Sequence, residues 1–401
     1  MSEKNTNTKA KKPAKKFQKP NPYLYDLLVR LAGMIFKFKF NVKIDRSGLK
    51  DLKGPALIIC PHISNIDFIL VAMALMPFRP SFVVSEHFMA KPKIRWFLEK
   101  MAVIPKKMFC ADVRTILTIM RAKEAGQLIV LFPEGRLTCF GHSLNLTEGT
   151  AELTKKLGID VYTVTGDGAY KTLPKWSKSG TRSGRIEVKT AKLFDGAELK
   201  DMPIEEVNAK LEAAIYHDED KLLEGVRFRG HDMALGLDGI LYKCPECGAE
   251  FEMDTAGSKI VCRKCGYSAW LKHDYTFEAG PFKTINDWYF WQEDQIDLDT
   301  PLESHTIVAA PGPDGIMDKN AGHGHIYMDR EKIEFKGEVF GQPLEFTLST
   351  DSVKALPASV HSHFDVYYDK VMYNMHLQPD RRAAIKWVIY LDKLHGNIKR
   401  Q

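Results

Sequence analysis

Apolar and polar residues follow two different patterns along the chain. From about residue 50 to residue 190, short apolar runs such as residues 56–60 and 128–131 alternate with stretches at helical spacing. Short apolar runs are typical of buried strands, and their alternation with helices predicts an α/β domain with a mostly buried sheet. Beyond residue 273, runs rich in aromatic and β-branched residues precede one helix over residues 381–394. This order predicts a small β-rich sandwich or barrel capped by that helix.

Other segments refine this division. Apolar residues alternate with polar ones over residues 36–44, which predicts a half-buried strand. Residues 185–189 are predicted to form a late strand, and residues 204–216 an amphipathic helix that closes the α/β domain. The predicted units are an arm over residues 1–22, the α/β domain over 23–215, a linker over 216–240, a cysteine-rich module over 241–272 and the β-rich domain over 273–401.

Positive charge is concentrated at the amino terminus. The first 50 residues hold 13 Lys or Arg against three acids, whereas the whole chain of 401 residues has a net charge of +6. The lysine-rich arm is predicted to be disordered, and it suits either solubility or attraction to an anionic membrane surface. A stripe of apolar residues at helical spacing follows it: Leu24, Leu27, Leu28, Leu31 and Ile35. Such a helix fits a membrane interface or packing on its own domain.

No apolar run reaches the roughly 18 to 20 residues that a membrane-spanning helix needs. The longest candidate, residues 68–78, is interrupted by Pro77 and followed by Arg79 and Pro80. No apolar core with a small-residue cleavage site follows the basic arm, so we expect no secretory signal. The expected location is the cytoplasm, with peripheral association with a membrane.

Two polar strings follow the two apolar runs. The first runs from His62 to Asp67 (HISNID), and the second covers residues 132–136 (FPEGR). Because ligands of open α/β sheets bind at the carboxyl ends of strands, we expect the two strings to form one site. A histidine with an acid five residues later is not diagnostic alone, since chance gives about two such pairs among 13 histidines and the chain has two. The presence of the second string makes His62 a candidate catalytic residue.

Together the strings resemble the conserved blocks of the glycerolipid acyltransferases, the 1-acylglycerol-3-phosphate acyltransferase family of bacterial type. His62, Ser64 and Asp67 match the family's NHxSxxD block, and residues 132–136 match the start of its FPEGTRS block. The resemblance covers roughly residues 40 to 215. It implies that residues 23–215 form an acyltransferase domain that begins with the amphipathic helix.

Acyl transfer to an alcohol needs a base that removes the hydroxyl proton as the oxygen attacks a thioester. A neutral imidazole does this near neutral pH, and a carboxylate on its other nitrogen fixes the tautomer. The prediction is that His62 is the base and Asp67 its partner. The nucleophile is the hydroxyl of the substrate, so Ser64 is predicted to cap a helix instead.

The family associates its second block with the phosphate of the acceptor. A guanidinium such as that of Arg136 grips phosphate oxygens in pairs, and Gly135 lets the backbone come close. Glu134 is predicted to orient Arg136 or the acceptor hydroxyl. Lys106 stands where the family's intermediate block ends in an arginine, and it is predicted to hold phosphate as a point charge.

The chain also departs from the family pattern. Pro61 replaces the asparagine that usually precedes the histidine, and Arg136 follows Gly135 directly where threonine is commoner. The sequence therefore predicts acyl transfer more firmly than it predicts which molecule accepts the acyl group. The default is 1-acylglycerol-3-phosphate, converted to phosphatidic acid, with acyl-CoA or acyl carrier protein as the donor.

Four cysteines form two C-x2-C pairs separated by fourteen residues: Cys244, Cys247, Cys262 and Cys265. This spacing resembles a zinc ribbon, in which four thiolates hold a structural Zn²⁺ tetrahedrally. Disulfides do not suit a cytoplasmic chain, and a redox pair does not need two copies. Since sulfur fills all four positions, the metal is not expected to take part in catalysis.

Two alternatives remain beside a membrane-associated O-acyltransferase. One is a nucleic-acid-binding protein built on the zinc ribbon and the lysine arm, and the other is a membrane scaffold with an inactive acyltransferase-like domain. The β-rich domain is similar in its expected topology to the pleckstrin-homology and GRAM folds, which does not fix its function. Acids near the first cysteine pair, Glu246, Glu250 and Glu252, argue against nucleic acid as a partner. A lysophospholipid substrate is the leading prediction.

Overall fold

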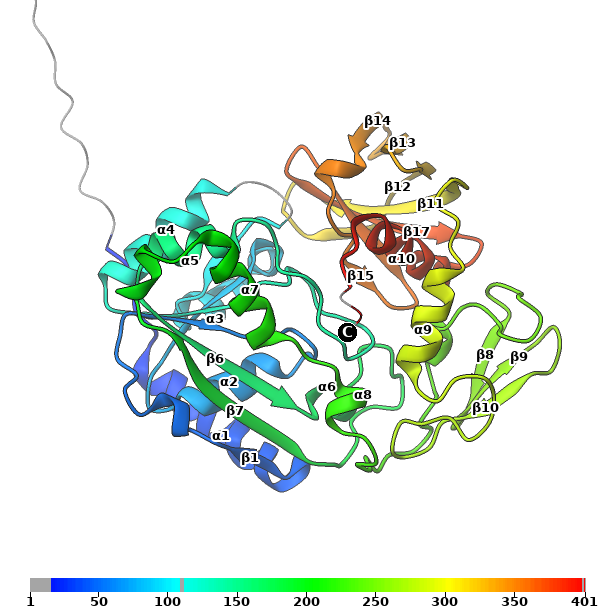
Figure 1. Cartoon of the computed structure of the whole chain (residues 1–401). Coiled ribbons are helices and arrows are strands. Elements are labelled where there is room, and N and C mark those ends of the chain that lie inside the picture. Colours follow the sequence, from blue (N-terminus) through cyan, green and yellow to red (C-terminus); the bar gives the residue numbers. More distant parts are fainter. Residues whose placement is uncertain (1–15, 109–111, 399, 401) are drawn as a thin grey trace, which may run out of the picture.

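The computed structural model describes residues 16–108, 112–398 and 400. Figure 1 shows an α/β domain on one side and a β-rich domain on the other, with the small cysteine-rich sheet at one end. Most of the predicted basic arm, and Cys110, lie outside the described residues. Within the described part, both predicted fold classes, α/β and β-rich, are confirmed.

The α/β domain is built on a seven-stranded mixed sheet with the order β1-β7-β6-β2-β5-β3-β4. Its strands are β1 (Val42–Ile44), β2 (Ala56–Ile59), β3 (Ser81–Ser85), β4 (Ile104–Lys106), β5 (Leu128–Leu131), β6 (Asp160–Asp167) and β7 (Ile186–Phe194). The five strands from β6 to β4 run parallel, whereas β7 pairs with β6 in the antiparallel sense and β1 follows β7. The carboxyl ends of the five parallel strands therefore share one edge.

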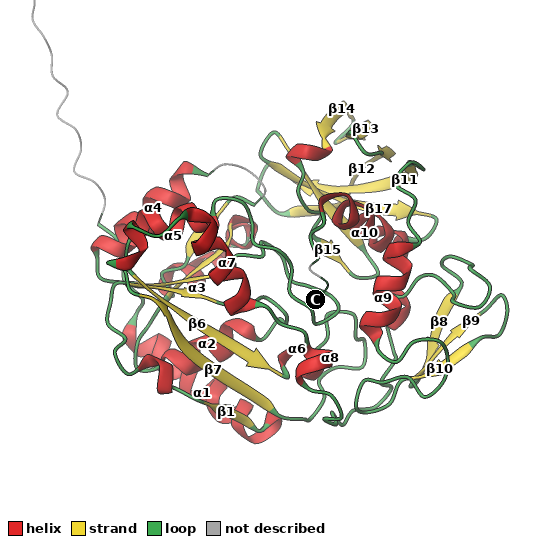
Figure 2. Ribbon diagram, in the orientation of Figure 1, coloured by secondary structure: helices red, strands yellow, loops and turns green. Residues whose placement is uncertain are grey.

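Helices cover both faces of this sheet (Figure 2). They are α1 (Pro22–Phe40), α2 (Asp67–Leu75), α3 (Pro92–Lys100), α4 (Val113–Glu124), α5 (Thr150–Leu157), α6 (Ala169–Thr172) and α7 (Ile204–Ile215). Side chains alternate along β5, so that Val130 joins the core beneath α2 while Ile129 joins the core beneath α4, α5 and α7. Burial on both faces explains why the central strands have uninterrupted apolar sequences.

The strand predicted for residues 36–44 is wrong, because α1 continues to Phe40 and only Val42–Ile44 is a strand. Asn21 caps this helix by accepting a hydrogen bond from the Leu24 N–H at 3.0 Å. The alternating sequence also fits a helix, in which Phe36 and Phe40 share one buried face with ring centroids 5.2 Å apart. Asn41 ends the helix in the left-handed conformation.

The predicted linker joins the α/β domain to the cysteine-rich module as a packed segment. It contains α8 (Glu219–Leu222) and a short 3-10 turn, η4 (Leu237–Gly239). Phe228 and Met233 within it are buried in the main core. The cysteine-rich module follows as a three-stranded antiparallel sheet: β8 (Met253–Ala256), β9 (Lys259–Cys262) and β10 (Ser268–Trp270).

The β-rich domain begins with α9 (Ile285–Asp294) and ends with α10 (Ala384–His395). Between them lies a seven-stranded antiparallel sheet in the order β14-β13-β12-β11-β17-β16-β15. Its strands are β11 (Leu302–Pro311), β12 (Met317–Met328), β13 (Lys332–Val339), β14 (Gln342–Ser349), β15 (Ala358–Ser359), β16 (His363–Tyr368) and β17 (Val371–Gln378). The predicted terminal helix is confirmed, and it ends as expected at Gly396, whose φ is 60°.

Candidate active site

The two polar strings meet at the carboxyl edge of the parallel strands. His62 lies three residues beyond β2, and the residues 132–136 follow β5, its neighbour in the sheet. The backbone N–H of His62 donates to Oε1 of Glu134 at 2.8 Å. The structure therefore brings both strings into one site, as predicted from their positions after adjacent strands.

His62 and Asp67 form a dyad in which Asp67 is buried and His62 is partly exposed. Nδ1 of His62 lies 3.1 Å from Oδ2 of Asp67, and the side chains are 29% and 7% exposed. A carboxylate beside Nδ1 favours the tautomer that carries its proton there, and this tautomer leaves a lone pair on Nε2. The imidazole packs against Phe132, with ring centroids 4.6 Å apart.

Backbone geometry holds Asp67 in place. It is the first residue of α2, and its Oδ2 also accepts hydrogen bonds from the N–H groups of Ile63 and Ser64, both at 2.8 Å. Burial raises the pKa of Asp67, and these bonds and His62 oppose that shift. The predicted helix cap at Ser64 is wrong, because its Oγ donates to the carbonyl of Leu173 at 3.4 Å. The Asp67 carboxylate binds the N–H groups ahead of the helix instead.

Glu134 supports the site through backbone hydrogen bonds, whereas the ion pair of Arg136 is made with Asp392. Its two oxygens accept N–H groups from His62 and Leu144, each at 2.8 Å. Burial raises the pKa of this carboxyl to about 7. Gly135 adopts a φ of +72°, and a Cβ there would lie 2.7 Å from the Thr147 side chain, so glycine is required for conformation. Glu134 thus fixes the backbone of the predicted base.

Arg136 is turned toward the β-rich domain. Its guanidinium forms an ion pair with Asp392 of α10, and the two side chains are 9% and 1% exposed. A second contact runs to the carbonyl of Leu356 at 3.5 Å. Sequence reasoning missed Asp392, because 256 positions separate the partners and no local pattern links them. The guanidinium predicted to bind phosphate is therefore occupied by a carboxylate of its own chain.

Lys106 lies at the end of β4, beside a cavity of about 350 Å³ between the two large domains. The α/β domain contributes Lys107 and the 3-10 turn η2 (Glu86–Ala90). The β-rich domain contributes residues of β11, β12 and the β16–β17 hairpin. The structure thus places Lys106 at the same edge of the sheet as His62, two strands further along from β5.

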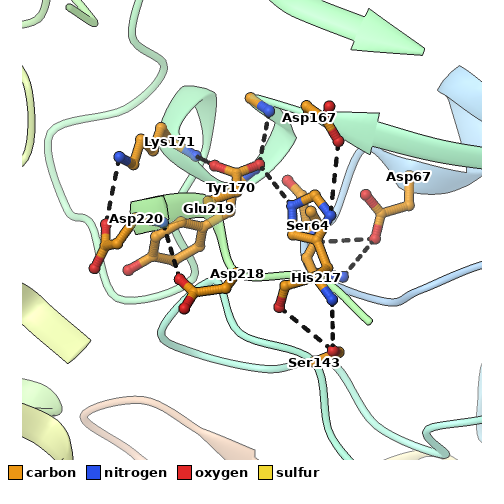
Figure 3. A network of polar contacts seen from close by, with 12 residues as sticks. Ser64, Asp67, Ser143, Asp167, Tyr170, Lys171, His217, Asp218, Glu219 and Asp220 are labelled. Atoms are coloured by element: carbon orange, nitrogen blue, oxygen red, sulfur yellow. Dashed lines mark hydrogen bonds and ion pairs between the residues drawn. The ribbon is translucent and has the colours of Figure 1, made fainter. Parts of the chain in front are cut away.

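A buried polar network lies behind the dyad (Figure 3). His217 sits between Asp167 and Glu219, with Nδ1 3.7 Å from one carboxylate and Nε2 3.5 Å from the other. Burial alone would lower the pKa of His217, but the surrounding carboxylates, Glu219 first, raise it. Glu219 also accepts backbone N–H groups of Gly168, Tyr170 and Lys171 at the start of α6. Residues that the sequence assigned to a linker therefore anchor the start of α6.

The four cysteines of the two C-x2-C pairs converge on one point. All four Sγ atoms lie within 4.8 Å of one another. The Sγ atoms of Cys244 and Cys265 are 3.7 Å apart, and those of Cys247 and Cys262 are 3.8 Å apart. Tetrahedral coordination with Zn–S bonds of about 2.3 Å requires a sulfur separation of about 3.8 Å, whereas a disulfide requires about 2.05 Å. The donor set and the spacing both fit zinc.

Three comparisons relate the chain to known proteins. Residues 39–166 match the family model described as Acyltransferase. The 1-acyl-sn-glycerol-3-phosphate acyltransferase LPAT1, chloroplastic, of Arabidopsis thaliana is 25% identical over 185 residues, or 44% of this chain and 51% of that protein. The chain thus spans about half the length of this curated relative. The crystal structure of the 1-acyl-sn-glycerophosphate acyltransferase PlsC from Thermotoga maritima aligns with 18% identity and a TM-score of 0.38, covering 48% of this chain and 79% of that one.

The matched residues include both polar strings, from His62 to Arg136. The resemblance predicted from these strings is therefore confirmed for this part of the chain. No helix within the described ranges is long and apolar enough to cross a membrane.

Proposed function

Because residues 39–166 match the acyltransferase family model, we propose that the protein transfers a fatty acyl group from a thioester to the free hydroxyl of a lysophospholipid. The observation that carries this proposal is the dyad at the strand edge, with Nδ1 of His62 3.1 Å from Asp67 and the imidazole open to solvent. A bare carboxylate or an isolated histidine would not supply an oriented base at neutral pH.

In the proposed reaction, Nε2 of His62 removes the proton of the acceptor hydroxyl. The oxygen attacks the carbonyl carbon of the thioester, a C–O bond forms, and the C–S bond breaks. The thiolate of the leaving donor takes up the proton from the imidazolium. Asp67 stabilises the imidazolium between these steps, and Glu134 keeps the His62 backbone in position through its 2.8 Å hydrogen bond.

The donor is proposed to be acyl-CoA or an acylated acyl carrier protein, and the default acceptor is 1-acylglycerol-3-phosphate, which would yield phosphatidic acid. This acceptor is the compound named in the description of the Arabidopsis relative, a 1-acyl-sn-glycerol-3-phosphate acyltransferase. Acyl transfer of this kind requires no metal. The four cysteines are proposed to hold one structural Zn²⁺ that stabilises the small sheet and its contacts with the β-rich domain.

The protein is also proposed to bind an anionic membrane surface through α1. This helix exposes a row of large apolar side chains: Tyr23, Leu27, Leu31, Met34, Ile35 and Phe38. Arg30 and Lys37 lie on the same helix, and Lys16 and Lys19 precede it. Apolar side chains beside basic ones are typical of helices that lie in the lipid interface. A lipid substrate would reach the site from that surface.

The test is an assay of the purified full chain with labelled oleoyl-CoA or oleoyl acyl carrier protein as donor and 1-oleoylglycerol-3-phosphate in mixed micelles as acceptor. We expect labelled phosphatidic acid from the wild-type protein and a loss of about 10² to 10⁴-fold in kcat for His62→Ala. The matched control is His323→Ala, which removes a histidine that is largely exposed on β12.

Both variants are expected to keep the thermal unfolding temperature of the wild type within a few degrees. Full activity in a folded His62→Ala variant would overturn the proposed mechanism. An inactive wild type with a broad set of thioester donors and lysophospholipid acceptors would overturn the proposed function.

A further inference from the structure

A cavity of about 350 Å³ lies where the β-rich domain meets the carboxyl edge of β3 and β4. Resting on the proposed acyltransferase function, we propose that Lys370 of the β-rich domain binds a phosphate in this cavity together with Lys106, the residue for which the family resemblance implies phosphate binding. The ligand class is a phosphate-bearing substrate with a flexible chain, either the acceptor lipid or the thioester donor.

The first observation is that Arg136 is not available for this role. Its guanidinium is buried and paired with Asp392 of α10. Releasing it would leave a carboxylate that is 1% exposed without its cation, which is strongly unfavourable. A phosphate in this part of the molecule therefore needs other cations, and the lining of the cavity includes lysines.

The second observation is the charge of the cavity lining. Lysines enter it from both domains: Lys106 and Lys107 from the end of β4, and Lys370 from the tip of the β16–β17 hairpin. Among the lining residues that the structure describes, the acids are Glu86 and Asp369. Glu86 lies within ion-pair distance of Lys107, at 4.0 Å, and of Arg114, at 3.6 Å. The local charge thus favours an anion.

The third observation concerns the conformation of Lys370. Tyr368 pairs with Val371, so Asp369 and Lys370 form a two-residue hairpin turn with φ values of 44° and 66°. Turns of this type strongly favour glycine at the second position. The β13–β14 hairpin of the same sheet has that arrangement, with Phe340 followed by Gly341 at φ values of 52° and 70°. A lysine therefore occupies a position that favours glycine, at the rim of the cavity.

The cavity also suits a chain attached to the phosphate. Its other lining includes Met108, Met317 and Met372, which are flexible apolar side chains that adapt to a ligand. The sheet order β2-β5-β3-β4 separates it from His62 by three strand spacings, about 14 Å between backbones. Phe132 bridges part of this span, because it packs on His62 and lies 6.5 Å from the ring of Phe82 in β3.

The experiment compares Lys370→Gly and Lys370→Arg with the wild-type full chain. Glycine removes the ammonium and suits the turn, so we expect an unfolding temperature equal to or above that of the wild type together with a KM raised about tenfold or more for one phosphate-bearing substrate. Arginine keeps the positive charge, so the KM of Lys370→Arg is expected to stay close to that of the wild type. The matched control is Gly341→Lys, which places lysine at the equivalent position of the hairpin outside the cavity and is expected to leave both KM values unchanged.

Separate titrations of the donor and the acceptor identify the source of the phosphate. A raised KM for the acceptor alone assigns the site to the lipid, and a raised KM for the donor alone assigns it to the thioester carrier. Unchanged KM values for both substrates in an active Lys370→Gly protein would overturn the inference and leave the proposed function intact.

If the wild type is inactive in every assay, the proposed function fails, and calorimetry with coenzyme A and with glycerol 3-phosphate tests the site itself. Binding of either compound that weakens about tenfold in Lys370→Gly supports the site. Equal binding by both proteins, or binding by neither, overturns it.

Discussion

Glu134 shows how a single buried carboxylate organises the candidate site. Its oxygens accept the N–H groups of His62 and Leu144, so one side chain ties the loop after β2 to the loop after β5. Burial raises the pKa of the carboxyl to about 7 from a usual value of 4.5. The backbone of the proposed base therefore depends on a group whose ionisation is costly in this environment.

The pH dependence of stability follows from this shift. Between pH 4.5 and about 7 the folded protein holds a proton on Glu134 that the unfolded chain has released, so the contribution of this residue to stability falls as pH rises. A Glu134→Gln variant lacks this pH-dependent contribution to stability, because its side chain does not ionise. We expect its unfolding temperature, relative to the wild type, to rise steadily from pH 5 to pH 7 and to stay constant above that.

Calorimetry across this pH range measures the difference. Glu148→Gln is the matched control, because Glu148 is 82% exposed and is not expected to produce such a trend. A constant difference between Glu134→Gln and the wild type from pH 5 to pH 8 would contradict the raised pKa.

The dyad could be predicted from the sequence, whereas the ion pair of Arg136 could not. His62 and Asp67 are five residues apart, and a strand end followed by a helix start brings them together, so a local motif suffices. Arg136 belongs to an equally recognisable motif, yet its observed partner Asp392 comes from another domain. The motif identifies a residue type at a strand end, but the direction of its side chain depends on what the rest of the chain places nearby.

At the scale of elements, α1 combines a buried and an exposed apolar face. Phe36 and Phe40 pack into the core, whereas Phe38 is 89% exposed. The phenylalanine-lysine alternation over residues 36–40 fits both a helix and a strand, and the contact between Phe36 and Phe40 favours the helix. Local alternation alone could not distinguish these outcomes, because the core that receives Phe36 is formed by distant segments.

The exposed face of α1 gives a prediction for membrane binding. Leu27→Ser combined with Phe38→Ser is expected to weaken binding to vesicles containing phosphatidylglycerol by about tenfold or more, because each large apolar side chain contributes about 1.5 to 3 kcal/mol when buried. Both side chains are more than half exposed, so the unfolding temperature is expected to stay close to that of the wild type. Co-sedimentation with vesicles measures the change.

Phe340→Ser provides the control, since Phe340 is a partly exposed phenylalanine on the β13–β14 hairpin, on the opposite side of the molecule from α1 (Figure 1). Equal vesicle binding by the α1 double variant and the wild type would exclude this helix as the membrane contact.

The cysteine-rich module is a second element whose stability is open to test. Its sheet places Met253 and Ile260 in the main core, and coordination of a metal by four thiolates would add to the stability of the module. We expect about one zinc per chain by elemental analysis. Cys247→Ser is expected to lose the metal and to lower the unfolding temperature, whereas Lys264→Ser, between the second pair of cysteines, is expected to keep both. A wild-type protein that contains no zinc, or one whose unfolding temperature is unchanged by a chelator, would contradict the assignment.

At the scale of the whole molecule, the β-rich domain is joined to the other parts by buried and half-buried polar contacts. Arg382 donates to the carbonyls of Met253 and Phe251 in the cysteine-rich module, at 2.6 and 2.7 Å. The end of α10 returns to the α/β domain, where the Asn145 N–H donates to the carbonyl of Asn397 at 2.9 Å. These contacts fix the β-rich domain over the carboxyl edge of the parallel sheet.

The order of the domains was predictable from the patterns of strands and helices, whereas their docking was not. Periodicity reports which face of an element is buried, but it does not say which other element covers it. The segment predicted as a linker illustrates this limit. Polar residues such as His217 and Glu219 suggested an exposed connector, but they are buried in a network beside the dyad (Figure 3).

Variants of Arg136 and Asp392 can test whether Arg136 serves the docking of the β-rich domain or the binding of substrate. If Arg136 is an interdomain contact, Arg136→Met leaves Asp392 buried without a cation and is expected to destabilise the protein by about 3 to 5 kcal/mol. Asp392→Leu is expected to have a similar effect. The double variant removes both charges, so it is expected to recover most of the lost stability, which gives a large favourable coupling in a double-mutant cycle.

Chemical denaturation of the four proteins measures this coupling, and the KM for the acceptor is determined for those that remain folded. In the Arg136→Met/Asp392→Leu protein we expect a KM close to that of the wild type, because phosphate binding is assigned to the lysine-lined cavity. A stable Arg136→Met protein with a strongly raised KM for the acceptor would instead assign Arg136 to the substrate. In that case the contact with Asp392 would have to open during the reaction, and the β-rich domain would move away from the site when the substrate binds.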